Sequence, residues 1–164
     1  MIKRNFTEDQ QAFRDAFRKF LHKEVVPNMD RWREEGIVDR NLFRKAGEQG
    51  FLMVWPDEEY GGAGLTDFRY EQVILEETGY ALCFEWYNTL HSRLTGPYLT
   101  RFGSKEQCER FLPKCVSGET ILAIGMTEPD AGSDLAGMRT TAKDMGDHWL
   151  LNGSKTYISN GINA

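Results

Sequence analysis

The sequence predicts a protein that is α+β by segments, with an N-terminal all-α helical bundle followed by the beginning of an antiparallel β domain. Apolar residues recur at helical spacing as far as Gly118, and two capping boxes, Thr7-Glu8-Asp9-Gln10 and Ser104-Lys105-Glu106-Gln107, mark helix starts. Beyond Gly118 apolar residues alternate, as they do in strands. We therefore expect a helical domain over residues 1–118 and an incomplete β domain over residues 119–164.

The first predicted helix begins after Thr7 and carries an apolar stripe that would pack on other helices. Pro27 should end or kink this helix, and the charged stretch that follows is interpreted as a turn running to Gly36. A shorter helix is expected from about Asn41 to Gln49, with Gly50 as its left-handed stop. The stripe consists of Phe13, Phe17, Phe20, Leu21 and Val25.

A segment rich in glycine separates these helices from the next ones. Residues 56–64 combine Pro56 with three glycines, so they cannot continue a helix. We interpret them mainly as a structural loop, with Tyr60–Gly64 as an alternative site candidate. Beyond the loop, Asp67 is the expected N-cap of a helix that Gly79 ends.

Two further helices are expected before the periodicity changes. One covers roughly Phe84–Phe102 and should kink or split at Gly96-Pro97. The other follows the second capping box and runs to about Val116, where Pro113 inside it favours a split.

The β part should open with a buried strand over Thr120–Met126, which is apolar and rich in β-branched residues. A second strand is expected over Met138–Ala142. Met145-Gly146-Asp147 should then turn the chain, so that His148–Leu151 pairs back.

Asn152-Gly153 is the strongest two-residue hairpin signal in the sequence and predicts another turn. Lys155–Ser159 would follow as a strand. So few strands with open edges do not form a stable sheet, and we expect that the sequence is cut inside its second domain.

Charge and composition exclude several classes of function. The net charge is −5 with acids and bases interspersed, so there is no basic stripe for nucleic acid. The longest apolar run, Phe51–Trp55, is far too short for a membrane span, and no signal or transit peptide is evident.

The cysteines and histidines show no metal or disulfide pattern. An odd number of cysteines without a C-x-x-C pair indicates small buried apolar residues in a reducing compartment. The three cysteines are Cys83, Cys108 and Cys115, and the three histidines, which form no metal-ligand pattern, are His22, His91 and His148.

The richest chemistry lies in Gly125–Gly137, the loop that follows the first predicted strand. Gly132 and Gly137 would let a ligand approach the backbone closely. The loop also carries two hydroxyls and three carboxylates, and because the carboxylates would repel a bare phosphate, a neutral polar ring is the better ligand. A tight turn between two strands remains the alternative. The polar residues are Thr127, Glu128, Asp130, Ser133 and Asp134.

This loop resembles the signature of the acyl-CoA dehydrogenase family, whose usual form is close to A-M-T-E-P-x-A-G-S-D. A second family signature matches Leu151–Gly161 at the family spacing. The order of helices followed by a β domain is also similar, and the resemblance covers essentially the whole chain. Within the family, Trp32–Leu52 and Leu90–Leu99 look most like the long-chain branch.

The resemblance implies that the chain contacts FAD through both signatures. Ser133 would also touch the CoA part of a thioester. His91 lies on a helix whose side chains approach the acyl chain in the family, so it is a substrate candidate, although a lone histidine of this kind is more often a core residue. The implied flavin contacts are Ile124, Met126, Thr127, Gly132, Ser133, Tyr157, Ile158 and Ser159.

Three positions differ from the usual family residues. Tyr157 stands where the family often has Trp and Ser159 where it often has Thr, and both keep an aromatic face and a hydroxyl near the flavin. Asp130 stands where Gly is frequent, and it adds a charge to the loop.

The implied reaction is α,β-dehydrogenation of an acyl-CoA thioester to a trans-2-enoyl-CoA, with electron-transfer flavoprotein as acceptor. The family's catalytic base is a glutamate in a C-terminal helical domain that nothing here matches, so no catalytic residue is assigned. Glu128 belongs to the flavin loop and is not a substitute. We expect the chain alone to be inactive and to bind FAD weakly.

The resemblance further implies a homo-oligomer in the bacterial cytoplasm or, in a eukaryote, the mitochondrial matrix. One alternative is another flavoenzyme on the same scaffold, such as an acyl-CoA oxidase or a flavin monooxygenase, which differs in whether oxygen reaches the reduced flavin. A non-catalytic helical binding or oligomerisation module is the other. The early stop favours it, and the intact pair of flavin signatures opposes it.

Overall fold

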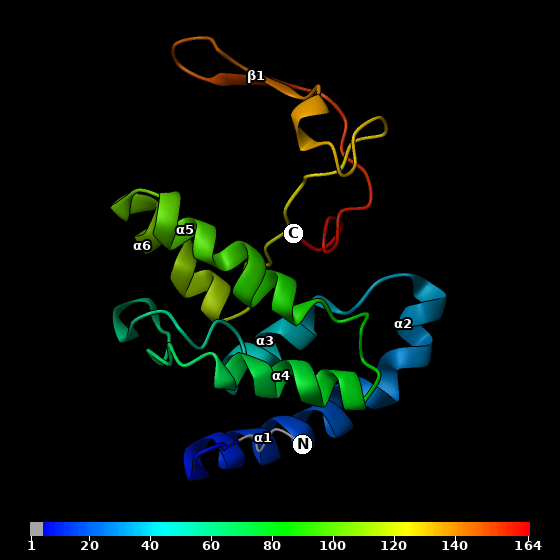
Figure 1. The fold of residues 1–164 in the computed structure, drawn as a ribbon, viewed down its shortest axis with the longest axis vertical. Helices are drawn as coiled ribbons and strands as arrows, with labels where there is room; N and C mark the ends of the chain where they lie inside the picture. The colour runs from blue at the N-terminus through cyan, green and yellow to red at the C-terminus, as the bar shows by residue number, and fades with distance from the viewer. Residues whose placement is uncertain (1–4) are drawn as a thin grey trace.

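A computed structural model describes residues 5–164 and shows a helical part from which a small β part projects (Figure 1). Helices α1 (Glu8–Phe20) and α4 (Arg69–Tyr80) lie side by side at one end. The hairpin of β1 (Thr141–Asp144) and β2 (Trp149–Asn152) lies at the opposite end, beyond α5 (Gly96–Phe102) and α6 (Lys105–Val116). The predicted fold class is thus confirmed.

The first helix begins as predicted, because Thr7 Oγ1 accepts from Gln10 N at 3.2 Å and Gln10 Oε1 accepts from Thr7 N at 3.1 Å. The helical path then continues through a π-helical turn, Leu21–Val25, and a 3₁₀ turn, Val26–Asn28, that contains Pro27. Pro27, which is expected to end or kink the helix, lies where the helical path changes from a π-helical to a 3₁₀ turn.

The turn predicted from Asp30 to Gly36 is wrong, because helix α2 spans Met29–Glu35. Proline is tolerated in the first turn of a helix, where its missing N–H has no intrahelical partner. Trp32 is buried on the inner face of α2, and Gly36 ends the helix at φ 69°. Most residues of α2 are charged, so the sequence shows no clear apolar stripe that would predict this helix.

Helix α3 (Arg40–Glu48) and its left-handed stop at Gly50, with φ 72°, agree with the sequence prediction. After the 3₁₀ turn Glu58–Tyr60, helix α4 begins at Arg69 with Phe68 as its N-cap, so the predicted N-cap Asp67 is wrong by one residue. The Asp67 carboxylate still accepts from Arg69 N at 3.0 Å. Gly62 lies so close to Pro56 that an added Cβ would be 2.0 Å from the Pro56 oxygen. This contact supports the structural interpretation of the loop.

The helix predicted over Phe84–Phe102 starts later than expected. Its first part is a π-helical segment, Leu90–Thr95, followed by α5 with Pro97 in the first turn. The predicted change at Gly96-Pro97 is therefore confirmed. Leu82 has φ 54°, and this left-handed residue lies in the turn that follows α4.

Helix α6 is continuous through Pro113, so the predicted split does not occur. Its capping box at Ser104 forms as expected, because Ser104 Oγ accepts from Gln107 N at 3.3 Å and Gln107 Oε1 accepts from Ser104 N at 2.8 Å. Gly118, with φ 74°, follows α6 and closes the helical part.

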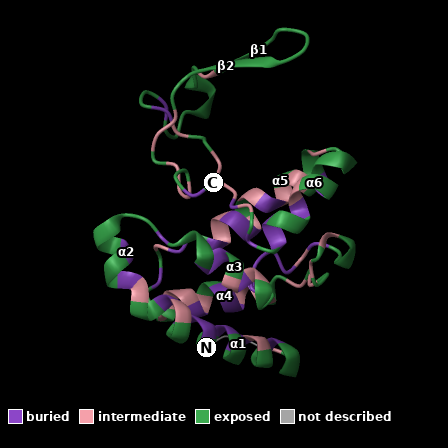
Figure 2. Ribbon diagram, turned by 180° about the vertical axis from the view of Figure 1, so that it is seen from behind, coloured by how far each residue is buried: buried purple, intermediate pink, exposed green. Residues whose placement is uncertain are grey.

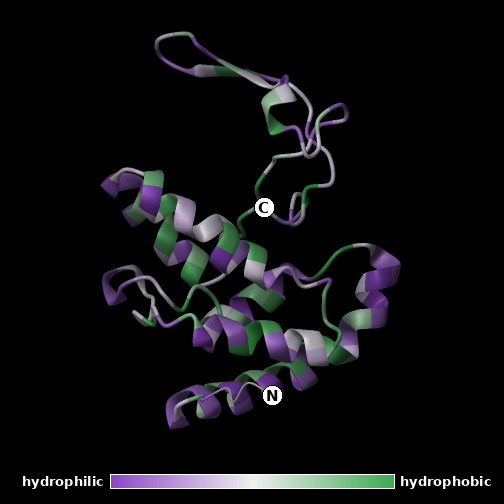
Figure 3. Ribbon diagram, in the orientation of Figure 1, coloured by the Kyte–Doolittle hydropathy of each residue, from purple (hydrophilic) through white to green (hydrophobic). Residues whose placement is uncertain are grey.

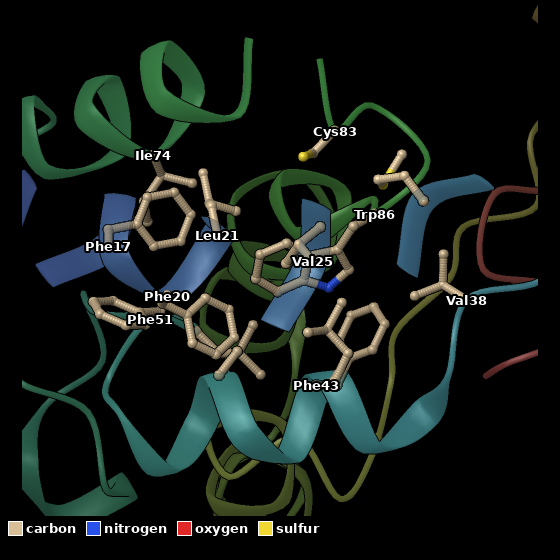
Figure 4. Packing of buried hydrophobic residues seen from close by; sticks show 14 of the residues in the cluster. Phe17, Phe20, Leu21, Val25, Val38, Phe43, Phe51, Ile74, Cys83 and Trp86 are labelled. Atoms are coloured by element: carbon tan, nitrogen blue, oxygen red, sulfur yellow. The ribbon is translucent and has the colours of Figure 1, made fainter. Parts of the chain in front are cut away.

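The main hydrophobic core lies between α1, α3, α4 and the segment around Trp86, as the packed side chains in Figure 4 show. Phe17 and Phe51 meet edge to face with ring centroids 5.1 Å apart, and Trp86 contacts Phe43 at 6.1 Å. A smaller cluster beside it joins Met53 to α6. Buried residues concentrate in these helices, whereas the hairpin is exposed along its length (Figure 2).

All three cysteines are buried and free, as expected for small core residues. No helix in the described range 5–164 has the length and apolar character needed to cross a bilayer.

The β part differs from its prediction in several places. The turn at Met145-Gly146-Asp147 and the strand that pairs back are confirmed, with Asp144 opposite Trp149. Asn152-Gly153 is not a hairpin turn, because Asn152 pairs with Thr141 in the same ladder. The strand predicted over Met138–Ala142 starts only at Thr141.

The other two predicted strands are wrong, because neither segment joins a ladder among the described residues. Within 120–126, Thr120 N donates to the Lys114 carbonyl at 2.9 Å and Leu122 N donates to His91 Nδ1 at 3.0 Å, so neither amide pairs with a strand. Lys155–Ser159 is interrupted by Tyr157, whose φ of 55° is incompatible with a strand.

Candidate functional site

The loop Gly125–Gly137 is organised around the carboxylate of Glu128, which is only 6% exposed. Its Oε2 accepts from Arg139 N at 2.7 Å, and its Oε1 accepts from Thr140 N at 3.0 Å and from Lys155 Nζ at 2.9 Å. Hydrogen bonds from Thr140, the Arg139 backbone and Lys155 lower the pKa of Glu128 to about 2. The group is therefore ionised and fully engaged by the protein.

Lys155 brings the second signature against the first. Its ammonium group also donates to the Met126 carbonyl at 3.3 Å, and its stem crosses Gly125, where an added Cβ would lie 3.3 Å from Lys155 Cγ. One residue later, Thr156 N donates to Thr127 O at 3.0 Å. Segments that lie about thirty residues apart in the sequence therefore run side by side.

The other carboxylates of the loop lie outside this network. Asp130 is exposed and pairs with Arg139 at 3.3 Å. The Asp134 carboxylate lies against Gly137, where an added Cβ would be 3.0 Å from Oδ2. The negative charge of Glu128 is compensated by Lys155, so the loop surface is less acidic than its composition indicates.

The predicted flavin residues of the first signature lie on the surface or just beneath it. Met126 is 39% exposed, and Gly132 and Ser133 are exposed on the outer turn of the loop. Ile124 and Thr127 are half-buried. None of these residues lines the large pocket described next.

The predicted residues of the second signature line an open pocket of about 670 Å³. Tyr157, Ile158 and Ser159 line it together with residues from the end of α2 through Val38. Tyr157 is 91% exposed. The structure thus brings the two signatures into backbone contact while presenting their side chains in two neighbouring groups.

Left-handed backbone fixes this second group in place. Tyr157 has φ 55° and Asn160 has φ 63°, conformations that are uncommon for residues other than glycine. Asn160 Nδ2 donates to the Leu122 carbonyl at 3.3 Å, and Asn163 Nδ2 donates to the Val38 carbonyl at 2.9 Å. The first bond ties the segment to the stretch that follows α6, and the second ties it to the helical part.

His91 lies in the core, with no exposed surface. Its Nδ1 accepts from Leu122 N at 3.0 Å, so Nε2 carries the proton and donates to the Cys115 carbonyl at 3.0 Å. Burial lowers the pKa of His91 to about 4. This geometry favours the core interpretation, because both ring nitrogens are used by the backbone.

Sequence reasoning missed an apolar stripe on the same helix. Leu94, Tyr98 and Phe102 are spaced by four residues and are 51%, 49% and 74% exposed. The rings of Tyr98 and Phe102 lie 5.7 Å apart. Hydrophobic and hydrophilic residues are mixed along this helix (Figure 3). The four-residue spacing of large apolar residues could have revealed this surface.

Comparisons with known proteins decide the family. The chain matches the acyl-CoA dehydrogenase N-terminal domain over residues 7–119 and the acyl-CoA dehydrogenase middle domain over residues 123–164. The chain belongs to the acyl-CoA dehydrogenase family.

Named relatives in this family include enzymes with different acyl-CoA substrates. The chain is 45% identical over 160 residues to the long-chain specific acyl-CoA dehydrogenase, mitochondrial, of Rattus norvegicus, covering 98% of the chain and 37% of that relative. It is 37% identical to glutaryl-CoA dehydrogenase of Desulfococcus multivorans, covering 98% of the chain and 42% of that protein. The chain thus spans about two fifths of the length of these relatives.

Solved acyl-CoA dehydrogenase structures share the fold. The acyl-CoA dehydrogenase from Geobacillus kaustophilus superposes with a TM-score of 0.93 at 48% identity, covering 98% of this chain and 42% of that one. A glutaryl-CoA dehydrogenase from Mycobacterium smegmatis in complex with FADH2 gives a TM-score of 0.86 at 32% identity, covering 97% and 41%. The predicted membership of the acyl-CoA dehydrogenase family is thereby confirmed.

Proposed function

We propose that this chain forms the helical domain and the first part of the middle domain of an FAD-dependent acyl-CoA dehydrogenase. The enzyme would oxidise an acyl-CoA thioester to a trans-2-enoyl-CoA. One observation carries the proposal: Thr156 N bonds to Thr127 O at 3.0 Å, while Lys155 pairs with Glu128. The two flavin signatures are therefore held together by the chain itself.

The exposed residues around this contact suit a flavin ring. Met126 and Tyr157 offer apolar and aromatic surface at 39% and 91% exposure, which suits a large planar heterocycle. Glu128 is buried and paired, so it would not repel the polar edge of such a ring. Relatives from Mycobacterium smegmatis and Bacillus anthracis have been solved with FADH2 and FAD, respectively.

Each predicted residue has a role that fits its position. Met126, Tyr157 and Ile158 would pack against the ring system and exclude water. The hydroxyls of Thr127 and Ser159 would bond its polar edge, and Ser133 would contact the CoA part of the substrate. Ile124 and Gly132 would shape the backbone along the ring.

Bound FAD supplies the two-electron chemistry that accepts hydride from the substrate. Glu128 does not remove the α-proton, because both of its oxygens are engaged and its pKa is held at about 2. The resemblance assigns the base to a glutamate in a C-terminal helical domain, outside residues 1–164.

The stripe of Leu94, Tyr98 and Phe102 is proposed as part of the wall for the acyl chain. A hydrocarbon chain placed there would bury apolar surface at roughly 25 cal/mol per Å². This surface, together with the similarity to the long-chain enzyme of Rattus norvegicus, favours a long acyl substrate.

The same proposal includes partners and compartment. Electron-transfer flavoprotein is the expected acceptor, and one similar structure, at 35% identity, is described as an electron transferring flavoprotein of Acidaminococcus fermentans. A homo-oligomer would cover the exposed strand edges. The expected compartment is the bacterial cytoplasm or the mitochondrial matrix.

The test uses the protein as its source makes it, purified with its bound flavin. Anaerobic mixing with palmitoyl-CoA should bleach the visible absorbance of the flavin, and butyryl-CoA should do so more slowly. Tyr157→Ala should weaken FAD binding by about tenfold, whereas Trp149→Ala, at an exposed aromatic residue on β2, should leave FAD affinity unchanged.

Absence of bound flavin, or flavin that no acyl-CoA reduces, would contradict the proposal. Fast reoxidation of the substrate-reduced flavin by oxygen would instead indicate an acyl-CoA oxidase on the same scaffold.

A further inference from the structure

Three separate segments meet at the ion pair of Glu128 and Lys155. Glu128 belongs to the first signature, Lys155 to the second, and the Arg139 and Thr140 amides to the chain that enters β1. Lys155 Nζ makes a further bond to the Met126 carbonyl. The ion pair therefore joins the first signature to the second and to the chain that enters β1.

Glu128 is buried and Lys155 is half-buried, so the buried carboxylate depends on the lysine to compensate its charge. The side chain of Glu128 is 6% exposed and that of Lys155 is 26% exposed. Removing one member of a buried pair leaves an uncompensated charge, which is far more disruptive than losing an exposed pair. Asp130 and Arg139 form an exposed pair on the same loop, with side chains 69% and 80% exposed, and so provide an internal comparison.

Neither member of the pair reaches outward from the surface. The Lys155 stem crosses the backbone at Gly125 instead of projecting into solvent, and the oxygens of Glu128 point to backbone amides. The pair is thus placed to set distances between segments and not to touch a ligand.

We propose that Glu128 and Lys155 are a positioning pair that fixes the spacing between Ile124–Thr127 and Tyr157–Ser159, and thereby the flavin affinity of this surface. The inference rests on the proposed function. It gives a role to Lys155, which is not among the flavin contacts that the resemblance implies.

The test compares variants of the protein as its source makes it, stripped of flavin and titrated with FAD. K155M should weaken FAD binding by at least about tenfold and alter the visible circular dichroism of the bound flavin. K155R, which keeps the charge and the reach to Glu128, should restore most of the affinity. D130N should bind within about twofold of the wild type.

A double variant provides the second readout. If the two residues act as one unit, E128Q/K155M should bind FAD no more weakly than E128Q alone. Because glutamine has nearly the same shape as glutamate, E128Q should fold. The FAD affinities of E128Q and K155R therefore still test the proposal if K155M does not fold.

The outcomes separate the two ideas. FAD binding by the wild type that E128Q leaves unchanged, or losses that add in the double variant, would overturn the positioning pair alone. A wild type that binds no FAD would overturn the proposed function together with it.

Discussion

At the scale of single residues, Glu71 on α4 is a carboxylate that the fold leaves unsatisfied. It is 2% exposed, and neither carboxylate oxygen has a hydrogen-bond partner among residues 5–164. Burial raises the pKa of Glu71 above its ordinary value, and the positive charge of Arg93 offsets part of this effect. The folded state therefore favours the neutral acid.

Glu71→Gln should stabilise the protein at neutral pH by on the order of 1 kcal/mol, because the amide carries no charge to desolvate. Since the pKa in the folded state lies above that in the unfolded state, the wild type is most stable below the unfolded pKa and loses stability as pH rises through the folded pKa. The gain should accordingly grow with pH in thermal melts from about pH 4 to about pH 8.

Glu48→Gln, at an exposed position near the end of α3, is the matched control for Glu71→Gln. It should show no such pH dependence. A Glu71→Gln variant whose melting temperature follows that of the wild type at every pH would mean that Glu71 is solvated in solution.

At the scale of secondary structure elements, two glycines mark a close approach between α3 and residues 117–118, which directly follow α6. A Cβ at Gly47 would lie 2.5 Å from the Ser117 carbonyl carbon, and a Cβ at Gly118 would lie 2.2 Å from the Phe43 oxygen. Such distances leave no room for any side chain. The backbone after α6 thus lies directly against the backbone of α3, which fixes where the chain leaves the helical part.

Gly118→Ala should destabilise the protein by more than about 2 kcal/mol, since it combines left-handed strain with a backbone clash. Gly36→Ala has almost the same φ, 69° against 74°, but no atom within 4 Å of the added Cβ. It should cost only about 1 kcal/mol. Urea denaturation of both variants measures the difference, and equal losses would show that the crowding at Gly118 relaxes freely.

Elements that depend on local signals could be predicted from the sequence. The Thr7 and Ser104 caps and the Gly50 stop are set by side chains within a few residues of each other, and all three form. The extended segment 120–126 could not be assigned, because its Leu122 bonds to His91 from a distant helix. Tertiary contacts decide such segments.

The position of the turn in the β part also depends on tertiary contacts that the local sequence does not show. Asn152-Gly153 has the better turn chemistry, yet the chain turns at Gly146, with φ 97°. An added Cβ at Gly153 would be 2.2 Å from Thr140 Oγ1, so this glycine serves a close approach between segments. A glycine's role is not visible from its dipeptide alone.

The candidate site was predictable as a list of residues but not as a geometry. The family resemblance selected Thr127 and Tyr157, and their contacts with FAD stay a prediction. The importance of Lys155 emerged only when its bonds to Glu128 and Met126 were known. In the sequence, nothing distinguishes Lys155 from a lysine whose side chain is exposed to solvent.

Considered as a whole, the molecule has a well-buried helical part and an exposed hairpin. Trp149, Leu150 and Leu151 are 64%, 52% and 72% exposed, so β2 presents apolar side chains on both faces. Figures 1 and 2 show the hairpin projecting away from the helices. Large exposed apolar surface of this kind drives association.

The 164-residue chain should therefore self-associate at micromolar concentration, as measured by sedimentation velocity. Leu151→Lys should reduce this association, because a charge on an exposed strand opposes edge pairing. Lys143→Gln, on the paired strand β1, removes a charge and should not reduce it. A wild-type chain that stays monomeric at about 100 μM would contradict this prediction.

The reactivity of the three buried thiols can report local unfolding of the parts of the core in which they lie. Cys83 belongs to the main core, whereas Cys108 and Cys115 belong to the smaller cluster. Burial raises the pKa of Cys115 to about 12 and also raises that of Cys83, so alkylation of either thiol requires prior exposure. Peptide mapping of a timed maleimide reaction would then reveal whether the two clusters open together or in sequence.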